Sequence, residues 1–268
     1  MRTVIIPERW ERLIDLIEER GRASVEEIAR ELSVSMPTVR RDLARIHGKG
    51  LIRRTRGGAE RSEAALRRLT LMDSSRVNTD AKEAIGRAAA ELIQPGECVM
   101  IDGGFTTYQV ARHIQASDLK VVTNSFDVAQ ALAGKRGVKI VMLGGEMLVD
   151  SGTTVGPTTE RQLGELVGDR AFLGANAISP AFGLCADIQH TAETKKAMIS
   201  DVREVVVVAD HSKLGKSALH RVAPIEAVSV LVTDDGADED LIEAFRSAGV
   251  AVVIVGTQDT SGGSSSTG

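Results

Sequence analysis

The chain has 268 residues, of which 43% are hydrophobic and 26% are charged, and its formal net charge at pH 7 is −4. Two domains with substantial cores fit this length, whereas no apolar segment is long enough to span a membrane and no signal-peptide core begins the chain. The two cysteines, Cys98 and Cys185, lie in apolar surroundings without metal-ligand spacing. We therefore expect a cytoplasmic protein with core thiols, without a disulfide and without a membrane partner.

The charge is unevenly distributed along the chain. Residues 1–68 contain 16 Lys and Arg against 11 Asp and Glu, whereas the remainder contains 17 against 26. A basic N-terminal module joined to an acidic body fits a DNA-binding head whose body is repelled by phosphate.

Two amphipathic helices are predicted at the start of the chain. The first runs from about residue 7 to 20, where Gly21 ends it, and its buried positions are Trp10, Leu13, Ile14 and Ile17. The second begins with the capping box Ser24-Val-Glu-Glu27, and its apolar row is Val25, Ile28, Ala29 and Leu32. The turn 33–35 then gives helix-turn-helix spacing.

A third helix, over residues 36–47, has two different faces. Val39, Leu43 and Ile46 fall at i, i+4 and i+7 and form one buried stripe. Ser35 suits the N-cap and Pro37 the first turn, so the helix begins where its N-terminus can stay exposed. The remaining polar face is cationic, as reading a DNA major groove requires.

After Gly48-Lys-Gly50, residues 51–58 read as a small basic hairpin, the wing of a winged helix. The predicted DNA-binding residues of helix and wing are Ser35, Pro37, Thr38, Arg40, Arg41, Arg45, Arg53, Arg54 and Arg56. The alternative is a small helical bundle with a solvated basic face, which leaves the cap, the turn spacing and the wing unexplained.

The expected domains are a winged helix-turn-helix domain over 1–60, a linker over 61–79, a sensor domain over 80–257 and a disordered Ser/Gly-rich tail over 258–268. From residue 97 onward strands and helices alternate, and several apolar runs are uninterrupted and β-branched, as in strands buried on both faces. The predicted strands are 98–101, 119–122, 138–143, 170–173, 205–208, 228–232 and 250–255, and the predicted helices are 80–93, 106–115, 126–133, 158–166, 190–202 and 238–247. This pattern indicates a doubly wound, mainly parallel α/β domain.

Small and polar residues follow five of these strands. In a parallel sheet such residues converge at the edge where ligands bind. Gly103-Gly104 lets backbone amides turn toward an anion, and Thr106 and Thr107 open a helix whose dipole favours negative charge. The predicted effector-binding residues are Asp102, Gly104, Phe105, Thr106, Thr107, Thr123, Asn124, Ser125, Gly144, Gly145, Lys195, Asp210 and Lys213. The expected ligand is a phosphorylated sugar or polyol.

Other polar residues have plainer explanations. Lys195 faces either the ligand or solvent, and His190 and His211 are read as ordinary hydrogen-bonding side chains. The five histidines form no metal cluster, so no metal is expected. No cofactor is expected either. The acidic run 234–240 reads as a solvated turn and helix start rather than a catalytic loop.

The order of motifs resembles the DeoR family of bacterial transcriptional regulators across nearly the whole chain. The motifs are Ser35-x-x-Thr-Val-Arg-Arg-Asp-Leu43, Gly50-Leu-Ile-Arg-Arg54, Gly57-Gly-Ala59, Lys82-Glu-Ala-Ile85, Asp102-Gly-Gly-Phe-Thr-Thr107, Thr123-Asn-Ser125, Leu143-Gly-Gly-Glu146, Glu193-Thr-Lys195 and Asp210-His-Ser-Lys213. The resemblance implies a winged-helix head and a sensor with a ribose-5-phosphate-isomerase-like fold. It also implies an oligomeric repressor of a sugar-catabolic operon, bound to double-stranded operator DNA and responsive to a phosphorylated sugar.

Two positions depart from the family pattern. Phe105 stands where Ser or Thr is usual, which removes one phosphate contact, and Arg56 stands where His is common before the wing glycines. The competing expectation is a sugar-phosphate isomerase with an attached DNA-binding module, motivated by the acidic run at 235–239. That run is not followed by a Lys-Gly-rich loop, so its catalytic pair is incomplete and no catalytic residue is assigned.

Overall fold

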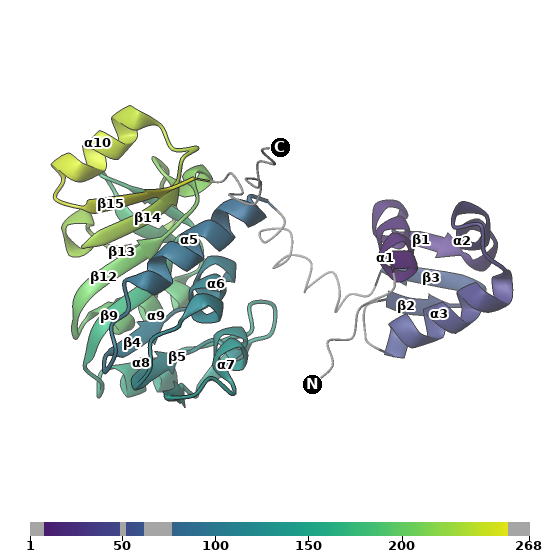
Figure 1. The fold of residues 1–268 in the computed structure, drawn as a ribbon, viewed down its shortest axis with the longest axis horizontal. Helices are drawn as coiled ribbons and strands as arrows, with labels where there is room; N and C mark the ends of the chain where they lie inside the picture. Colours follow the sequence, from purple (N-terminus) through teal and green to yellow (C-terminus); the bar gives the residue numbers. More distant parts are fainter. Residues whose placement is uncertain (1–7, 49–51, 62–76, 257–268) are drawn as a thin grey trace, which may run out of the picture. The chain divides into compact units, whose positions relative to one another are not determined.

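The computed structural model describes residues 8–48, 52–61 and 77–256, which belong to two compact units, Met1–Asp73 and Ser74–Gly268 (Figure 1). Most of the predicted linker, residues 62–76, lies outside the described residues, as does the predicted tail over 258–268.

Within its described residues, the N-terminal unit combines three helices with a small antiparallel sheet. Its elements are α1 (Glu8–Arg20), β1 (Arg22–Ser24), α2 (Val25–Glu31), α3 (Met36–Gly48), β2 (Ile52–Thr55) and β3 (Gly58–Arg61). The strand order is β1-β3-β2. The wing hairpin is therefore present, and β1 adds a strand that the sequence did not predict, because its partner lies more than thirty residues away.

Local signals place the helices of this unit where they were expected. The Ser24 hydroxyl accepts a hydrogen bond from the Glu27 N–H, and the Glu27 carboxylate accepts one from the Ser24 N–H at 2.8 Å, which completes the capping box. Gly21, with φ +75°, follows the last residue of α1. Of the expected core residues, Ile14 is only half-buried, whereas Leu16, which the pattern missed, is buried.

The C-terminal unit is built on a seven-stranded parallel sheet with the order β15-β14-β12-β9-β4-β5-β6. The strands are β4 (Cys98–Ile101), β5 (Leu119–Thr123), β6 (Val138–Met142), β9 (Gly168–Gly174), β12 (Val202–Val208), β14 (Val230–Asp234) and β15 (Ala251–Val255). Each predicted strand is present, and the doubly wound fold class is confirmed.

Helices cover both faces of this sheet (Figure 1). They are α5 (Thr79–Glu91), α6 (Phe105–His113), α7 (Phe126–Leu132), α8 (Pro157–Leu163), α9 (Gln189–Ile199) and α10 (Glu239–Ser247). α5, α6 and α7 pack with Phe172 on one face, and α8, α9 and α10 pack with Ala171 and Leu173 on the other. Alternate residues of one strand thus enter separate cores, which explains the uninterrupted apolar runs.

Several short strands outside the main sheet were not predicted. They are the hairpin β7 (Glu146–Leu148) and β8 (Thr153–Val155), and a second sheet of β10 (Ala177–Ser179), β11 (Gly183–Ala186) and β13 (His220–Ala223). Short 3-10 turns, η1 (His211–Lys213) and η2 (Ile225–Ala227), complete the unit. Strands of three or four residues carry too little periodicity to be read from sequence.

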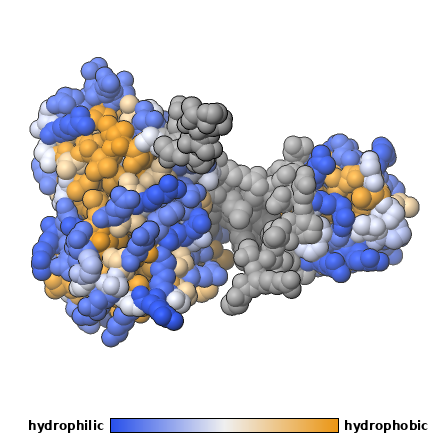
Figure 2. All heavy atoms as spheres, in the orientation of Figure 1, coloured by the Kyte–Doolittle hydropathy of each residue, from blue (hydrophilic) through white to orange (hydrophobic). Residues whose placement is uncertain are grey.

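One face of the C-terminal unit carries an exposed apolar patch (Figure 2). On the face seen in Figure 2, hydrophobic residues gather over the β15 end of the sheet, where Ile254 is 45% exposed. Among the residues described, no helix is long and apolar enough to cross a membrane, and no group of three or more His, Cys, Asp or Glu residues could hold a metal ion. Cys98 and Cys185 are free thiols.

The strand order creates a crevice at the centre of the sheet. β5 lies on one side of β4, and β9 lies on the other, followed by β12. The chain leaves β4 into α6 on one face, but after β9 it passes through β10 and β11 to α9 on the opposite face. Connections that diverge in this way leave room for a ligand at the carboxyl ends of the central strands.

Candidate functional site

The helix α3 separates an apolar face from a cationic one. Val39, Leu43 and Ile46 are each at most 1% exposed and form part of the core of the N-terminal unit. Arg40, Arg41 and Arg45 are exposed, and Thr38 is half-buried beside them. The predicted division of this helix into two faces is present in the structure.

Asp42, the one acidic residue of α3, faces inward. It is 3% exposed, and its carboxylate accepts hydrogen bonds from Arg9 Nε at 2.8 Å and Trp10 Nε1 at 3.0 Å. Two donors from α1 thus hold its charge and fix α3 against α1. The outer face of α3 consequently stays cationic.

The start of α3 is accessible. Ser35 occupies the N-cap position, since its carbonyl accepts the first helical hydrogen bond from Val39 N at 3.1 Å. Its hydroxyl lies 2.8 Å from the Thr38 hydroxyl, and Pro37 is exposed in the first turn. These groups leave the first-turn amides free for a phosphate or a base edge.

The wing presents arginines on a fixed hairpin. Arg53, Arg54 and Arg56 are exposed, although Arg53 forms an ion pair with Glu60 across the hairpin. At Gly58, a Cβ atom would lie 2.2 Å from the Ala23 carbonyl oxygen, so close pairing with β1 requires glycine. All nine predicted DNA-binding residues lie on α3, on the residue that precedes it, or on the wing.

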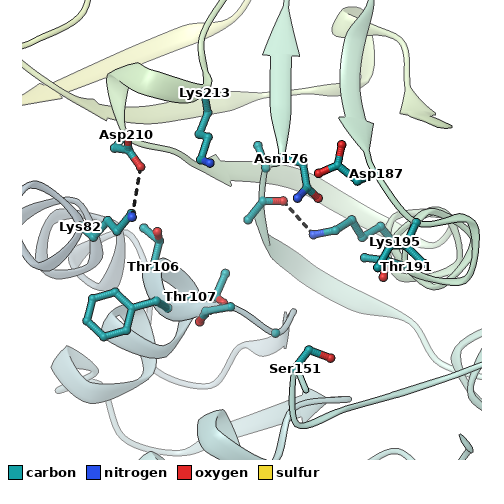
Figure 3. A pocket seen from close by; sticks show the side chains of 16 residues that line it. Lys82, Thr106, Thr107, Ser151, Asn176, Asp187, Thr191, Lys195, Asp210 and Lys213 are labelled. Carbon is teal, nitrogen blue, oxygen red and sulfur yellow. Dashed lines mark hydrogen bonds and ion pairs between the residues drawn. The ribbon is translucent and has the colours of Figure 1, made fainter. Parts of the chain in front are cut away.

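A cavity of about 290 Å³ opens in the C-terminal unit at the carboxyl ends of β4, β9 and β12 (Figure 3). Its lining residues are Lys82, Gly103, Gly104, Phe105, Thr106, Thr107, Ser151, Gly174, Ala175, Asn176, Asp187, Ile188, Thr191, Lys195, Asp210 and Lys213. It lies at the crevice that the strand order creates, as the topology requires.

The loop after β4 shapes one wall of this cavity. Gly104 has φ +135°, a conformation that favours glycine, and it is the N-cap of α6. The Thr107 hydroxyl is buried and donates to the Gly104 carbonyl at 2.9 Å, so it holds the loop rather than presenting itself to a ligand. The unpaired first-turn amides of α6 and the Thr106 hydroxyl remain as donors.

Lys82, Asp210 and Lys213 form the charged side of the cavity (Figure 3). Lys82 Nζ is 3.6 Å from the Asp210 carboxylate. Burial lowers the pKa of Lys82 below its ordinary value, opposed by Asp210 and assisted by Lys213. Burial alone would raise the pKa of Asp210, but hydrogen bonds from Ser212 and Asn78, together with Lys82, bring it below the ordinary value. A partly desolvated ammonium gains from an incoming anion.

Lys195 lines the opposite side and is 3% exposed. Its ammonium forms an ion pair with Asp102, which is equally buried, and donates to the Gly174 carbonyl at 2.8 Å. Asp102 itself does not line the cavity. The pair therefore ties α9 to the ends of β4 and β9 at the floor of the cavity. Lys195 is thus buried away from bulk solvent, and its ammonium already has protein partners next to the cavity.

Six predicted effector residues do not line the cavity: Asp102, described above, and Thr123, Asn124, Ser125, Gly144 and Gly145. The hairpin β7–β8 covers the end of β5, since Thr154 N donates to the Asn124 carbonyl at 2.8 Å and the Asn124 side chain donates to the Thr154 carbonyl at 2.9 Å. Gly144 N donates to Gln162 at 3.1 Å. These residues form hydrogen bonds within the protein that hold the loops together. In their place Ser151, in the turn between the two hairpin strands, lines the cavity.

Several lining residues were not in the predicted effector-binding set, although Gly103 and residues 174–176 lie in turns that the sequence analysis placed at the ligand edge. They are Lys82, Gly103, Ser151, Gly174, Ala175, Asn176, Asp187, Ile188 and Thr191. Lys82 lies in α5, far from any strand end in sequence, and Asp187 follows the unpredicted strand β11. The one sequence signal for Lys82 was its place in a family motif.

Comparisons with known proteins match both units. A model of the DeoR-like helix-turn-helix domain matches residues 9–65, and a model of the DeoR C terminal sensor domain matches residues 77–235. The chain is 30% identical to the HTH-type transcriptional repressor GlcR of Bacillus subtilis over 92% of this chain and 95% of that protein. It is 33% identical to the glycerol-3-phosphate regulon repressor of Escherichia coli K12, over 85% of this chain and 90% of that protein.

Solved structures also match the chain. Ribose 5-phosphate isomerase A from Methanocaldococcus jannaschii aligns at 21% identity over 51% of this chain and 55% of that chain, with a TM-score of 0.38.

Proposed function

Because the chain belongs to the DeoR family of transcriptional regulators, we propose that it represses a sugar or polyol catabolic operon and that a phosphorylated metabolite in the cavity controls its grip on the operator. The observation that carries this proposal is the pairing of a cationic α3 face on one unit with a donor-rich cavity on the other. The two relatives described above are named as transcriptional repressors, one of them of the glycerol-3-phosphate regulon.

Operator recognition is proposed to use α3 in the major groove and the wing arginines on phosphate. Arg41 and Arg45, one turn apart on the exposed face, would reach base edges, while Arg54 and Arg56 would contact the backbone. A homo-oligomer would present two such heads to successive major grooves, and we expect it to act in the cytoplasm.

The effector is proposed to place its phosphate between Lys213 and the N-terminus of α6. Lys213 lines the cavity, and its ammonium makes no hydrogen bond or ion pair within the described part of the chain. First-turn amides of α6 and Thr106 supply the remaining donors. A ligand shifts operator affinity only through its differential affinity for the two conformations of the repressor.

We also propose that the cavity binds its ligand without converting it. The acidic run that motivated an isomerase contributes no lining residue, and the carboxylate of Asp234 accepts a hydrogen bond from the backbone N–H of His211 at 2.7 Å. A carboxylate that does not line the cavity cannot move a proton on a ligand bound there.

Thermal shift against phosphorylated sugars and polyols, each paired with its unphosphorylated form, tests the effector site. A compound present at 100 times its Kd and bound only to the native state should stabilise by about 2.7 kcal/mol. For a unit of this size that corresponds to roughly 5–10 °C in Tm. Lys213→Ala should abolish the shift, because the phosphate loses its unshared cation.

Lys216→Ala is the matched control, since Lys216 is an exposed lysine that does not line the cavity. This variant should keep the full shift, and the stabilising compound should be recovered unchanged after incubation. Equal stabilisation by phosphorylated and unphosphorylated partners would contradict a phosphate site, and turnover of the compound would contradict a purely sensory role.

A further inference from the structure

The cavity is electrically asymmetric, with unshared charges of opposite sign on its two sides. Lys82 is paired with Asp210, and Lys195 is paired with Asp102. Among the lining residues, Lys213 and Asp187 are the charged side chains that make no hydrogen bond or ion pair within the described residues. Figure 3 places Lys213 on the side of Lys82 and Asp210, and Asp187 on the opposite side with Asn176 and Thr191.

We propose that this asymmetry selects ligands with a single anionic group, and that Asp187 is the specificity-determining residue that rejects a second. The inference rests on the proposed effector site. An anion at the Lys213 side leaves the rest of the ligand facing Asp187, Asn176 and Thr191. A carboxylate accepts hydrogen bonds from hydroxyl groups but repels a phosphate or a carboxylate. The ligand class is therefore a polyol or sugar monophosphate, not a bisphosphate or a phosphorylated acid.

Two probe pairs that differ by one anionic group test this proposal: glycerol 3-phosphate against 3-phosphoglycerate, and fructose 6-phosphate against fructose 1,6-bisphosphate. Calorimetric titration of the full chain should show the singly anionic member of a pair binding at least about tenfold more tightly. Asp187→Asn, which keeps the shape and removes the charge, should reduce that preference by about tenfold or more.

Asp118→Asn is the matched control, because Asp118 is exposed just before β5, at the opposite edge of the sheet, and asparagine tolerates its φ of +59°. It should leave the preference of the wild type intact. Equal affinity of the wild type for both members of each pair, or an unchanged preference in Asp187→Asn, would overturn the role of Asp187. Failure of all four probes and of inorganic phosphate to bind would instead contradict the effector site itself, and this inference with it.

A second observation concerns how the cavity connects to the rest of the chain. α5 is the first element of the described C-terminal unit, so the chain from the N-terminal unit enters just before it. Asn78, its N-cap, has φ +58°, and its side-chain amide donates to the Asp210 carboxylate at 2.9 Å. Lys82, one turn further along α5, donates to the Val77 carbonyl at 2.6 Å and pairs with Asp210.

Asp210 and Lys82 thus belong at once to the cavity wall and to the entry of α5. We infer that Asn78, Lys82 and Asp210 form the coupling cluster through which the effector acts on the head, an inference that also rests on the proposed function. An anion that reaches Lys82 competes with Asp210 and with the Val77 carbonyl for the same ammonium group. The ligand thereby changes the contacts that hold residues 77 and 78, where the chain passes toward the DNA-binding unit.

Asn78 gives a clean test, because it does not line the cavity. Asn78→Gly keeps the left-handed backbone and removes the amide, whereas Asn78→Asp keeps the backbone and sets a carboxylate against Asp210. The readout is affinity for an operator selected from a random DNA library, with and without glycerol 3-phosphate or fructose 6-phosphate, whichever binds. Allosteric couplings are on the order of 5- to 150-fold, and both variants should reduce the wild-type factor to below about threefold while still binding the ligand.

Glu83→Gln, also in α5 but paired with Arg87 and His113 away from the cluster, is the control and should respond as the wild type does. Hydrogen exchange of the first-turn amides of α5 should change on ligand binding in the wild type and in Glu83→Gln, but not in Asn78→Gly. An Asn78 variant that keeps the full wild-type response would overturn the coupling cluster. If the wild type binds both ligand and operator without any mutual effect, effector control itself fails, and the cluster with it.

Discussion

Replacing Arg41 by alanine is expected to weaken operator binding by about 1–3 kcal/mol, on the order of 5- to 150-fold, because a bidentate contact to a base edge is lost. Arg41 lies on the exposed face of α3, whose orientation the buried Asp42 fixes against α1. Fluorescence anisotropy with a library-selected operator measures the effect. The loss should be smaller on unrelated DNA, since non-specific binding depends on phosphate contacts.

Arg20→Ala is the matched control for this prediction. Arg20 closes α1, where it pairs with Glu31 at 3.2 Å, and its removal changes the net charge of the head by the same amount. We expect Arg20→Ala to lose less than about threefold in operator affinity, as for a single surface charge that does not contact bases. Equal losses in Arg20→Ala and Arg41→Ala would mean that charge, not groove reading, explains the effect, and the assignment of the recognition face would be wrong.

Replacing Lys195 by methionine is expected to destabilise the C-terminal unit by about 3–5 kcal/mol, because Asp102 is left as a buried charge without its cation. Both residues are 3% exposed, so water cannot replace the missing partner. The Tm of that unit should fall by roughly 6–20 °C, and calorimetry of the full chain follows it separately from the transition of the head.

The double variant Asp102→Asn/Lys195→Met shows whether charge or packing is responsible. Removing both charges should recover a substantial part of the stability, since the penalty comes mainly from the uncompensated carboxylate. If the free energy of unfolding of Lys195→Met lies within about 1 kcal/mol of the wild-type value, the Asp102–Lys195 pair does not stabilise the floor of the cavity.

Much of the cationic face of α3, the proposed DNA-binding face, could be predicted from local sequence. The stripe Val39, Leu43 and Ile46 determines which side of α3 is buried, and the arginines follow from it, because helical spacing alone places them. The capping box at Ser24 likewise acts within a few residues. What local reasoning missed was Asp42, whose partners Arg9 and Trp10 lie more than thirty residues away and become visible only when α1 packs on α3.

In the sensor domain, too, some features could be predicted from local sequence and others depend on contacts between distant residues. Its seven strands were predictable because each is rich in apolar residues, and a parallel sheet puts their carboxyl ends at one edge. The sequence did not predict which of those strand ends form the cavity. The turns after β4, β9 and β12 reach it because the strand order reverses there, whereas the turn after β5 is covered by the hairpin β7–β8.

The sequence by itself thus determined the class of fold, the exposed cationic face of α3 and the polar edge of the sheet, since these depend on spacing within single elements. The tertiary structure decided that Thr123, Asn124 and Ser125 hold the backbone, while Lys82 and Asp187 enter the cavity. The physical reason is that a side chain's role at a sheet edge depends on strand order and on which segments cover the edge. Both are set by contacts between residues far apart in the chain.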